Sequence, residues 1–379
     1  MEVLGPLVEQ AGRHTTRPAL TVTAVDLTTV TDTTAVIHAT DRDGLVHVHR
    51  VADLPCDSTT EVSITVDGRP TTVAVTTLPT PAGERLATVA TVNDVHFGEV
   101  VAGQIDDLDD GPLRHVAPGD EPYPEVMNRA AVAEIQEIRP DAVVVKGDLS
   151  LDGTDEEWAA FEDCYRTPFG ERLHVVRGNH DSYRHQDRYT GDQRIEVDGL
   201  VIALLDTAIP GETTGRITPD QIDWLDTVAA TADLPVMAMG HHQQWIPHAD
   251  DPETGERRSD DYFGLHPDGS DRLDELCARR PSIVAYSAGH THRHRRRPMT
   301  RSGATSIEVG CTKDFPGTWC EYRVYEGGVM QVVHRMSSPQ ALAWSESCRV
   351  LYSDFGIDYG TYALGSLADR CFVLTARAG

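Results

Sequence analysis

Five short motifs of histidine, carboxylate and amide side chains run along this sequence in a fixed order. They are Asp94-Val95-His96, Gly147-Asp148, Gly178-Asn179-His180-Asp181, Gly240-His241-His242 and Gly289-His290-Thr291-His292. Imidazole nitrogens and carboxylate or amide oxygens are donors that divalent metal ions accept in proteins. Two such ions held side by side acidify a shared water and make it a nucleophile. The motif series therefore predicts a dinuclear metal centre with hydrolytic chemistry.

Each motif follows a short apolar run that is typical of a buried β-strand. The runs cover residues 86–93, 143–145, 173–176, 236–239 and 283–287. Helix-like segments alternate with these runs, at residues 124–138 and 154–166 and after Thr218, and Thr154 and Thr218 each begin a capping box. Alternating strands and helices are typical of an α/β domain, in which ligands collect at the carboxyl ends of the strands. We therefore expect the motifs to converge at one edge of a sheet.

Seven side chains from the motifs form the expected ligand set. They are Asp94, His96, Asp148, Asn179, His241, His290 and His292. Asp148 follows a buried strand and a glycine, which makes it the expected bridging carboxylate. Two divalent ions with Asp94, Asp148 and a bridging hydroxide would leave about one positive charge, which would attract one phosphate group.

The five motifs resemble those of the calcineurin-like metallophosphoesterase superfamily over residues 86–334. The resemblance implies an α/β (α+β) fold, a four-layer αββα sandwich of two mixed sheets with both metals at the strand carboxyl ends. It places Asp94, His96, Asp148 and His292 on one metal, and Asp148, Asn179, His241 and His290 on the other. It also implies that His180 acts beside the leaving group as a proton donor or transition-state stabiliser, with Asp181 as an orienting partner.

Departures within the motifs narrow the subclass that the chain resembles. Purple acid phosphatases carry a similar β-module before the catalytic domain, but they have a tyrosine and a glycine where this chain has Leu151 and His96. Serine/threonine protein phosphatases have an arginine shortly after the second motif, and residues 148–153 contain none. The pattern is most similar to bacterial cyclic-nucleotide and glycerophosphodiester phosphodiesterases, although Gln243 stands where that group often has proline.

The motifs thus predict a metal-dependent phosphoric ester hydrolase in which a hydroxide bridging two metal ions attacks phosphorus in line. A phosphodiesterase is the first hypothesis, and a phosphomonoesterase with the same site is the alternative. A metal-free interaction scaffold would lack ligands, and none is missing. A DNA nuclease is disfavoured by the net charge of −27, which repels nucleic acid. The expected partner is a small phosphate ester, and the expected cofactors are two divalent ions, with iron, manganese and zinc all acceptable.

Other polar residues near the motifs have two interpretations each. His242 adjoins His241, and one extended segment does not bring both to the same cluster. The family pattern favours His241 and leaves His242 as a contact either to the substrate or to the metal ligands. The basic run after His292, which includes Arg293 and Arg295, is either a solvated loop or a phosphate contact at the rim. The aromatic residues within 243–266 would border the site, either to stack a nucleobase or to cover the sheet edge.

We divide the 379 residues into five parts. They are an N-terminal segment (1–20), a small β-sandwich-like module (21–78), a linker (79–85), the catalytic domain (86–334) and an unassigned C-terminal extension (335–379). The seven cysteines are scattered without a Cys-x-x-Cys pair and are interpreted as reduced thiols. No signal-like start and no apolar run of about 18 residues is present, so a cytoplasmic location without membrane contact is expected. The oligomeric state stays open.

Overall fold

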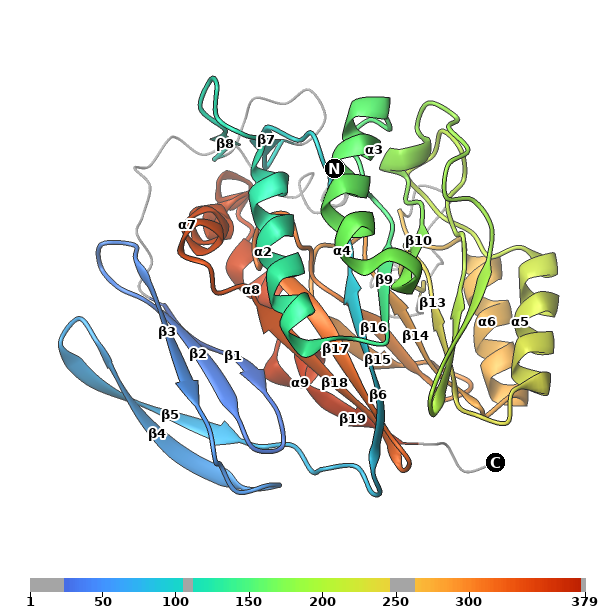
Figure 1. Ribbon diagram of the computed structural model, residues 1–379, viewed down its shortest axis with the longest axis horizontal. Helices are drawn as coiled ribbons and strands as arrows, with labels where there is room; N and C mark the ends of the chain where they lie inside the picture. The colour runs from blue at the N-terminus through green and yellow to red at the C-terminus, as the bar shows by residue number, and fades with distance from the viewer. Residues whose placement is uncertain (1–23, 105–111, 246–262, 376–379) are drawn as a thin grey trace.

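Two six-stranded sheets form the centre of the computed structural model, which describes residues 24–104, 112–245 and 263–375 (Figure 1). The first sheet has the order β10 (Leu173–Val176), β9 (Ala142–Lys146), β6 (Arg85–Val92), β17 (Thr318–Tyr325), β18 (Gly328–Arg335) and β19 (Phe372–Leu374). The second has the order β11 (Gln193–Val197), β12 (Leu200–Leu204), β13 (Val236–Met239), β14 (Ile283–Ala288), β16 (Thr305–Glu308) and β15 (Arg295–Pro298).

Both sheets are mixed in strand direction. In the first sheet β6, β9 and β10 are parallel, while β17 runs antiparallel to β6. In the second, β12, β13, β14 and β16 are parallel, and the edge strands β11 and β15 are antiparallel to their neighbours. The parallel strands that precede the motifs therefore end on the same side of the molecule.

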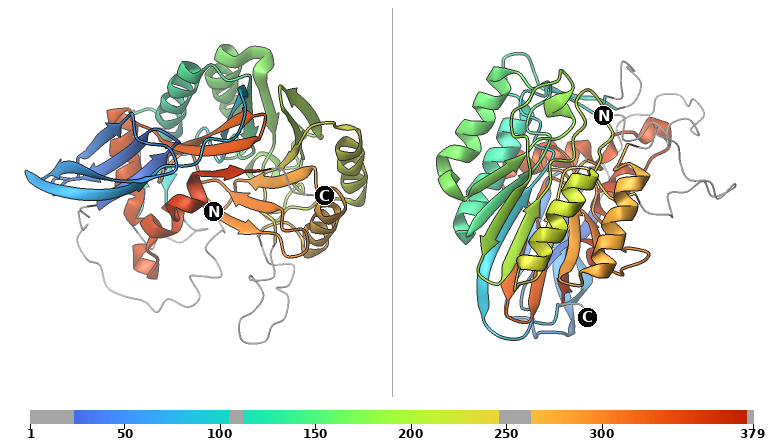
Figure 2. Two further views of the ribbon diagram at one scale, coloured as in Figure 1. Left: turned by 90° about the horizontal axis from the view of Figure 1, so that it is seen from below. Right: turned by 90° about the vertical axis from the view of Figure 1, so that its right-hand side faces the viewer.

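Helices cover the outer face of each sheet (Figures 1 and 2). The first sheet carries α2 (Tyr123–Ile138), α3 (Asp155–Phe161) and α4 (Thr167–Phe169), and the second carries α5 (Pro219–Thr231) and α6 (Pro267–Arg279). The order helix, sheet, sheet, helix confirms the predicted four-layer sandwich. None of the described helices is long and apolar enough to cross a membrane.

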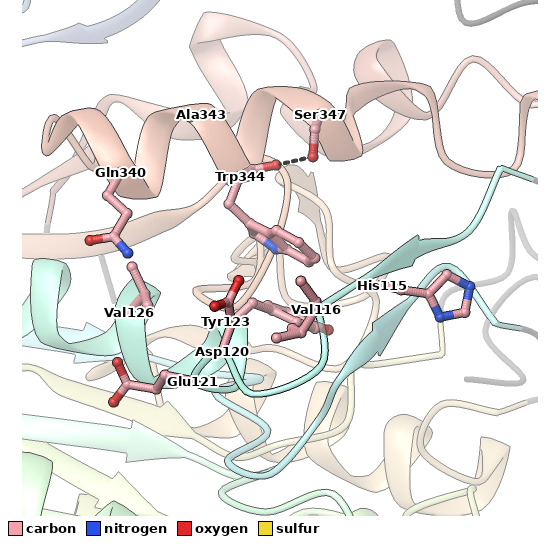
Figure 3. Close-up of a pocket in the computed structure, with 11 residues that line it drawn as sticks. His115, Val116, Asp120, Glu121, Tyr123, Val126, Gln340, Ala343, Trp344 and Ser347 are labelled. Carbon is pink, nitrogen blue, oxygen red and sulfur yellow. Dashed lines mark hydrogen bonds between the residues drawn. The ribbon is translucent and has the colours of Figure 1, made fainter.

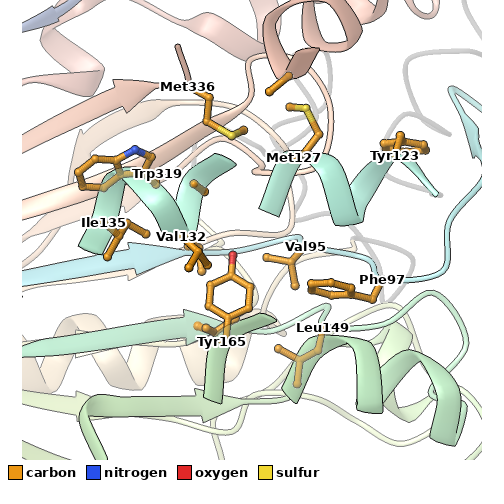
Figure 4. Close-up of a cluster of buried hydrophobic side chains, with 14 of the residues drawn as sticks. Val95, Phe97, Tyr123, Met127, Val132, Ile135, Leu149, Tyr165, Trp319 and Met336 are labelled. Atoms are coloured by element: carbon orange, nitrogen blue, oxygen red, sulfur yellow. The ribbon is translucent and has the colours of Figure 1, made fainter. Parts of the chain in front are cut away.

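Three apolar cores hold the four layers together, and single strands contribute to two of them. In β9, Val143 and Val145 pack toward α2, whereas Ala142 and Val144 pack between the sheets. The alternation follows from the two-residue period of a strand, which sends neighbouring side chains to opposite faces. The core between the first sheet and α2 is drawn in Figure 4. Strands buried on both faces explain why the runs before the motifs are continuously apolar.

The predicted helix starts are confirmed at both capping boxes. The hydroxyl of Thr154 accepts from the backbone of Glu157, and that of Thr218 accepts from Gln221, while each partner side chain bonds back to the cap backbone. The helix expected over residues 154–166 is less regular than predicted. Its second half, Glu162–Arg166, is π-helical.

The region before the sandwich is built from antiparallel strands, as expected. A three-stranded sheet contains β1 (Ala24–Val30), β2 (Ala35–Thr40) and β3 (Val46–Val51), and a hairpin contains β4 (Thr59–Val66) and β5 (Arg69–Thr76). Its apolar side chains pack on Met330 and Val332 of β18. The outer face of the first sheet is therefore covered partly by helices and partly by these N-terminal strands.

The C-terminal residues, which the sequence left unassigned, add to both parts of the molecule. They form α7 (Pro339–Ser347), α8 (Tyr359–Leu364) and α9 (Leu367–Arg370) before β19 joins the edge of the first sheet. The guanidinium group of Arg370 donates to the backbone carbonyls of Leu27 and Thr28 in β1. This segment thus ties the N-terminal strands to the sandwich.

A buried ion cluster at this junction predicts an acid-sensitive stability. Glu346 contacts Arg335 at 2.7 Å and Arg349 at 2.6 Å, and Arg349 pairs with Asp26. Burial raises the pKa of Glu346, but the two arginines lower it more strongly, from 4.5 to about 2. This depressed pKa stabilises the fold by on the order of 3 kcal/mol above pH 4.5, and the contribution disappears as pH falls toward 2.

Glu346→Gln should therefore lower the free energy of unfolding by about 3 kcal/mol at pH 7 and by less than half of that near pH 3, because the unfolded-state carboxyl is then protonated while the folded one, with its pKa of about 2, is still mostly charged. Urea unfolding at both pH values measures the difference. Glu171→Gln, which changes an exposed residue, is the matched control and should have no effect at either pH. A deficit of Glu346→Gln that is equal at pH 7 and pH 3 would contradict the prediction.

Candidate metal centre

The five motifs follow the carboxyl ends of β6, β9, β10, β13 and β14, which belong to both sheets. The structure brings the seven predicted ligand side chains together there, and none is more than 7% exposed. Donor atoms of Asp94, His96 and His292 lie within 4.8 Å of one another, as do those of Asp94, Asp148 and His241. The site is thus built where the edges of the two sheets meet.

Asp148 lies at the centre of this arrangement. Its Oδ2 is 3.4 Å from Nε2 of His96 and 3.2 Å from Nε2 of His241, while Oδ1 accepts from the backbone of His180. Oδ2 of this carboxylate therefore faces histidines from both predicted ligand groups, as a bridging ligand must. Nε2 of His292 lies 3.6 Å from Asp94.

Backbone carbonyls orient two of the histidines. Nδ1 of His241 donates to the carbonyl of Lys146, and Nε2 of His290 donates to that of Phe263, both at 2.8 Å. Because a carbonyl only accepts, each bond fixes the tautomer and leaves the opposite ring nitrogen with its lone pair. In His241 that nitrogen faces Oδ1 of Asn179 at 3.0 Å. These lone pairs are what a metal ion requires.

Five of the predicted ligands occupy left-handed backbone conformations. They are Asp94, His96, Asp148, His290 and His292, with φ between 46° and 68°. Residues other than glycine rarely adopt this region, and each instance costs about 1–3 kcal/mol unless the surroundings compensate. The turns bend the chain directly after a strand. Asp94 and His96, or His290 and His292, can therefore serve one site although they are two residues apart.

Glycines in the motifs allow neighbouring backbones to approach closely. A Cβ atom on Gly147 would lie 2.6 Å from the His241 ring, and one on Gly178 would lie 2.1 Å from Oδ1 of Asp148. One on Gly289 would lie 2.8 Å from Oδ2 of Asp94. The absence of a side chain at these positions is therefore a packing requirement of the site.

The electrostatics of the site favour a bound cation. Burial raises the pKa of Asp94 to about 6. Burial lowers the pKa of His241, but the charge of Asp148 raises it to about 9, so the lone pair on Nε2 attracts a cation strongly, whether a proton or a metal ion. Both ring nitrogens of His96 are buried without a hydrogen-bond partner among the described residues. Buried carboxylates and unpaired imidazole nitrogens form a donor set that fits divalent metal ions.

His180 and Asp181 lie beside this set in different roles. The ring of His180 is 4.5 Å from that of His96, and its Nδ1 donates to the carbonyl of Leu151. The neutral ring therefore has its lone pair on Nε2, and proton donation from Nε2 requires the imidazolium form. The carboxylate of Asp181 accepts from the backbone amides of Gly178, Leu149 and Ser150, so it joins two motif loops. The partner that orients the His180 ring is thus a carbonyl.

The structure distinguishes His242 from His241. Nδ1 of His242 bonds the hydroxyl of Thr207 at 2.9 Å, and Nε2 donates to the carbonyl of Thr213 at 3.1 Å. Both ring nitrogens are thus engaged by the protein, which supports the choice of His241 as the ligand. His242 still packs on His241 and His290.

One interpretation expected a loop throughout the basic run after the last motif, but only the first part of the run is a loop. Its second part forms β15, because the segment pairs with β16 at the sheet edge. Arg293 and Arg295 both contact Glu308, at 2.8 and 3.1 Å. Their charges therefore balance the buried carboxylate of Glu308.

Most of the aromatic segment 243–266 lies outside the described residues. Trp245 is 1% exposed and packs in the interior, so it does not stack on a ligand at the surface. Phe263 lies with its ring 5.4 Å from that of His290. Phe263 therefore packs on a predicted ligand.

Sequence patterns missed several side chains that support the ligands. Nδ2 of Asn93 donates to Asp94 and to two carbonyls after β16, while Glu99 and Lys313 form an ion pair beside His96. The only sequence signal was that Lys313 is one of two lysines in the chain. A separate cavity of about 590 Å³ lies between α2 and α7 and is lined by Tyr123 and Trp344 among others (Figure 3). None of the predicted site residues lines it.

The fold agrees with comparisons to known proteins. The model of the calcineurin-like phosphoesterase family matches residues 87–294, and the chain belongs to this family. It is 27% identical over 169 residues to a protein of Synechococcus sp. named as a probable cyclic nucleotide phosphodiesterase, covering 43% of this chain and 62% of the relative. It is 25% identical over 173 residues to one of Arcobacter nitrofigilis named as a probable glycerophosphodiester phosphodiesterase, covering 41% and 58%.

The chain therefore spans about three fifths of the length of these relatives. Among solved structures, a dimetal phosphatase from Danio rerio has a similar fold, with a TM-score of 0.52 and 17% identity over 66% of this chain and 97% of the other. The predicted resemblance to the superfamily and to its phosphodiesterase group is confirmed.

The close packing at Gly178 leads to a prediction. In Gly178→Ala the new Cβ would meet Oδ1 and the backbone nitrogen of Asp148, so the loop has to shift. We expect metal content to fall and the free energy of unfolding to drop by about 1–3 kcal/mol. Gly360→Ala in α8 is the control, because its nearest contact is a side-chain carbon at 3.0 Å and alanine favours a helix. Metal analysis and thermal unfolding of both variants check this, and full metal content in Gly178→Ala would contradict it.

Proposed function

We propose that this protein is a phosphoric ester hydrolase that depends on two divalent metal ions, and that its substrates are phosphodiesters. The observation that carries the proposal is the convergence of seven buried donor side chains from five motifs around Asp148. Backbone carbonyls fix the tautomers of His241 and His290, and left-handed turns direct five of the seven side chains toward the site. Membership of the calcineurin-like phosphoesterase family supports the same chemistry.

In this proposal two overlapping ligand groups hold the two ions. One contains Asp94, His96, Asp148 and His292, and the other contains Asp148, Asn179, His241 and His290. The ions would be iron, manganese or zinc, which all accept imidazole and carboxylate donors. When bound, they would neutralise charge on the phosphate group and acidify the attacking water.

The remaining residues act on the substrate and on the ligands. His180 presents Nε2 beside His96, and there it stabilises the transition state or, as imidazolium, protonates the leaving oxygen. Asp181 keeps the loops of the second and third motifs together through its four donors from backbone and Ser150. The geometry of the metal ligands therefore depends on Asp181, although its carboxylate accepts hydrogen bonds mainly from backbone amides.

The names of the relatives favour a phosphodiester over a phosphomonoester. Because the metal centre serves both reactions, we propose a direct comparison on the manganese-loaded protein. Turnover of bis(4-nitrophenyl) phosphate should exceed that of 4-nitrophenyl phosphate, and cyclic nucleotides and glycerophosphodiesters should be tested alongside. Chelator-treated protein is the control and should be inactive. A preference for the monoester would make the protein a phosphomonoesterase, and no turnover of any ester by protein containing two metals would refute the proposal.

Two substitutions separate metal binding from the chemical step. Asp148→Asn removes a buried charge that faces both ligand groups, so we expect metal content to fall and turnover to be lost. His180→Ala should keep both metals while kcat falls about 100- to 10,000-fold, the usual range for an acid–base group. Metal analysis and steady-state kinetics of the two variants give the answer. Equal loss of metal in both would contradict these roles.

A further inference from the structure

The imidazole of His96 is held between two carboxylates. Nε2 lies 3.4 Å from Oδ2 of Asp148, and Nδ1 lies 3.4 Å from Oε2 of Glu99. His96 and Glu99 have side chains no more than 3% exposed, and neither ring nitrogen has a hydrogen-bond partner in the described part of the chain, so these two carboxylates are polar neighbours of the ring. The nitrogen next to Asp148 faces the shared ligand position, so the opposite nitrogen is directed at Glu99. This differs from His241 and His290, whose second nitrogens meet backbone carbonyls.

The local chain conformation brings Glu99 to this place. The backbone of Glu99 donates to the carbonyl of His96, which closes a tight turn directly after the first motif. Gly98 within the turn has φ of +91°, a conformation that side chains disfavour, and Phe97 is paired with Ser150 in the second motif loop. Because Glu99 is three residues from His96 in a fixed turn, its carboxylate stays beside the ring.

Lys313 neutralises this carboxylate from a distant part of the chain. Its Nζ lies 2.5 Å from Oε2 of Glu99 and 3.9 Å from Asp314, and its side chain is 1% exposed. Only two of the 33 basic residues are lysines, and both are completely buried. The other, Lys146, bonds the Ser287 hydroxyl and the Ala288 carbonyl. A carboxylate buried behind a metal ligand needs such a partner to remain charged.

We propose that Glu99 is a positioning residue for His96, that Lys313 holds Glu99 in place, and that this pair sets the affinity of one of the two metal positions. The inference rests on the proposed metal centre. The Glu99 carboxylate faces Nδ1 of His96 at 3.4 Å, which favours a proton on Nδ1, leaves the lone pair on Nε2 and raises the basicity of the ligand. The ion near Asp94, His96 and His292 depends on the pair, whereas the ion near Asn179, His241 and His290 does not.

Two competing roles for the same residues predict different results. The Glu99–Lys313 pair would be purely structural if it stabilised the fold without affecting the metals. In the second role, the donor atoms of His292, Cys311 and Asp314, which lie within 4.8 Å of one another, would hold a third ion next to the pair. Cys311 already donates to Asp314 at 3.1 Å, which satisfies both groups without an ion. We therefore favour a positioning role.

The test compares metal binding by the wild-type protein, Glu99→Gln, Glu99→Leu and Lys313→Met. Mn²⁺ is titrated into the chelator-treated protein, and the Co²⁺-loaded forms are examined by visible absorption, which reports ligand geometry. In Glu99→Leu we expect the Kd of one Mn²⁺ to rise about 10- to 100-fold while the second is unchanged, the usual effect of losing such a partner. Glu99→Gln should recover part of the affinity, because an amide oxygen still accepts from Nδ1.

A double variant tests the connection to Lys313. Lys313→Met should weaken the same Mn²⁺ position in the wild-type background and should have little further effect in Glu99→Gln, because the lysine acts through the carboxylate. Glu346→Gln is the matched control, since it breaks another buried ion pair far along the chain. It should lower stability without changing either Kd or the Co²⁺ spectrum.

Different outcomes would refute this inference, the proposed function or both. Unchanged Mn²⁺ affinity and Co²⁺ spectrum in Glu99→Leu, with a loss of stability like that of Glu346→Gln, would make the pair structural. A third bound Mn²⁺ that disappears in Cys311→Ala would favour a third ion site over a positioning role. A wild-type protein that binds two ions but cleaves no phosphate ester would refute the proposed function and leave this inference intact. A wild-type protein that binds no Mn²⁺ would refute both.

Discussion

The burial of the Asp148 carboxylate at the meeting edges of two sheets is the constraint on which the rest of the site depends. A charge in that position needs compensation from every side. One oxygen takes a backbone hydrogen bond from His180, and the other faces imidazoles from both sheets, those of His96 and His241. Because the compensating groups come from β6, β10 and β13 as well as β9, the charge is satisfied only when both sheets are in register. The site therefore forms only together with the fold.

The layered apolar cores keep both sheets in register by fixing the positions of the strand ends. Apolar side chains alternate between the inner and outer cores along β9, so the strand does not slide by one residue without exposing its apolar face. The strained turns after the strands then direct the ligands. Backbone strain at Asp94, Asp148 and His290 is tolerated because packing on both sides leaves the chain no alternative path. Glycines remove the atoms that would otherwise separate the motif loops.

The sequence predicted the parts of this structure that repeat a local pattern. The strand ends followed by His and Asp residues and the capping boxes at Thr154 and Thr218 were predicted from short-range signals and from the family resemblance. Contacts between distant segments carried no such signal. Lys313 lies 214 residues after Glu99, and three short α-helices separate β19 from its partner β18. The residues close to each segment in sequence therefore do not predict its partner. The strand at Arg295 was missed because a run of arginines resembles a solvated loop in sequence.

The groups that orient the histidines differ, and this difference divides the site into two halves. Backbone carbonyls orient His241 and His290, and these bonds form as soon as the chain folds, whatever the side chains nearby. His96 depends instead on a carboxylate that itself needs a lysine. A carbonyl dipole is a fixed and neutral acceptor, whereas a carboxylate gives more electron density to the ring and can be altered by a single substitution. The half that contains His96 is therefore where this protein can tune its metal affinity without rebuilding its fold.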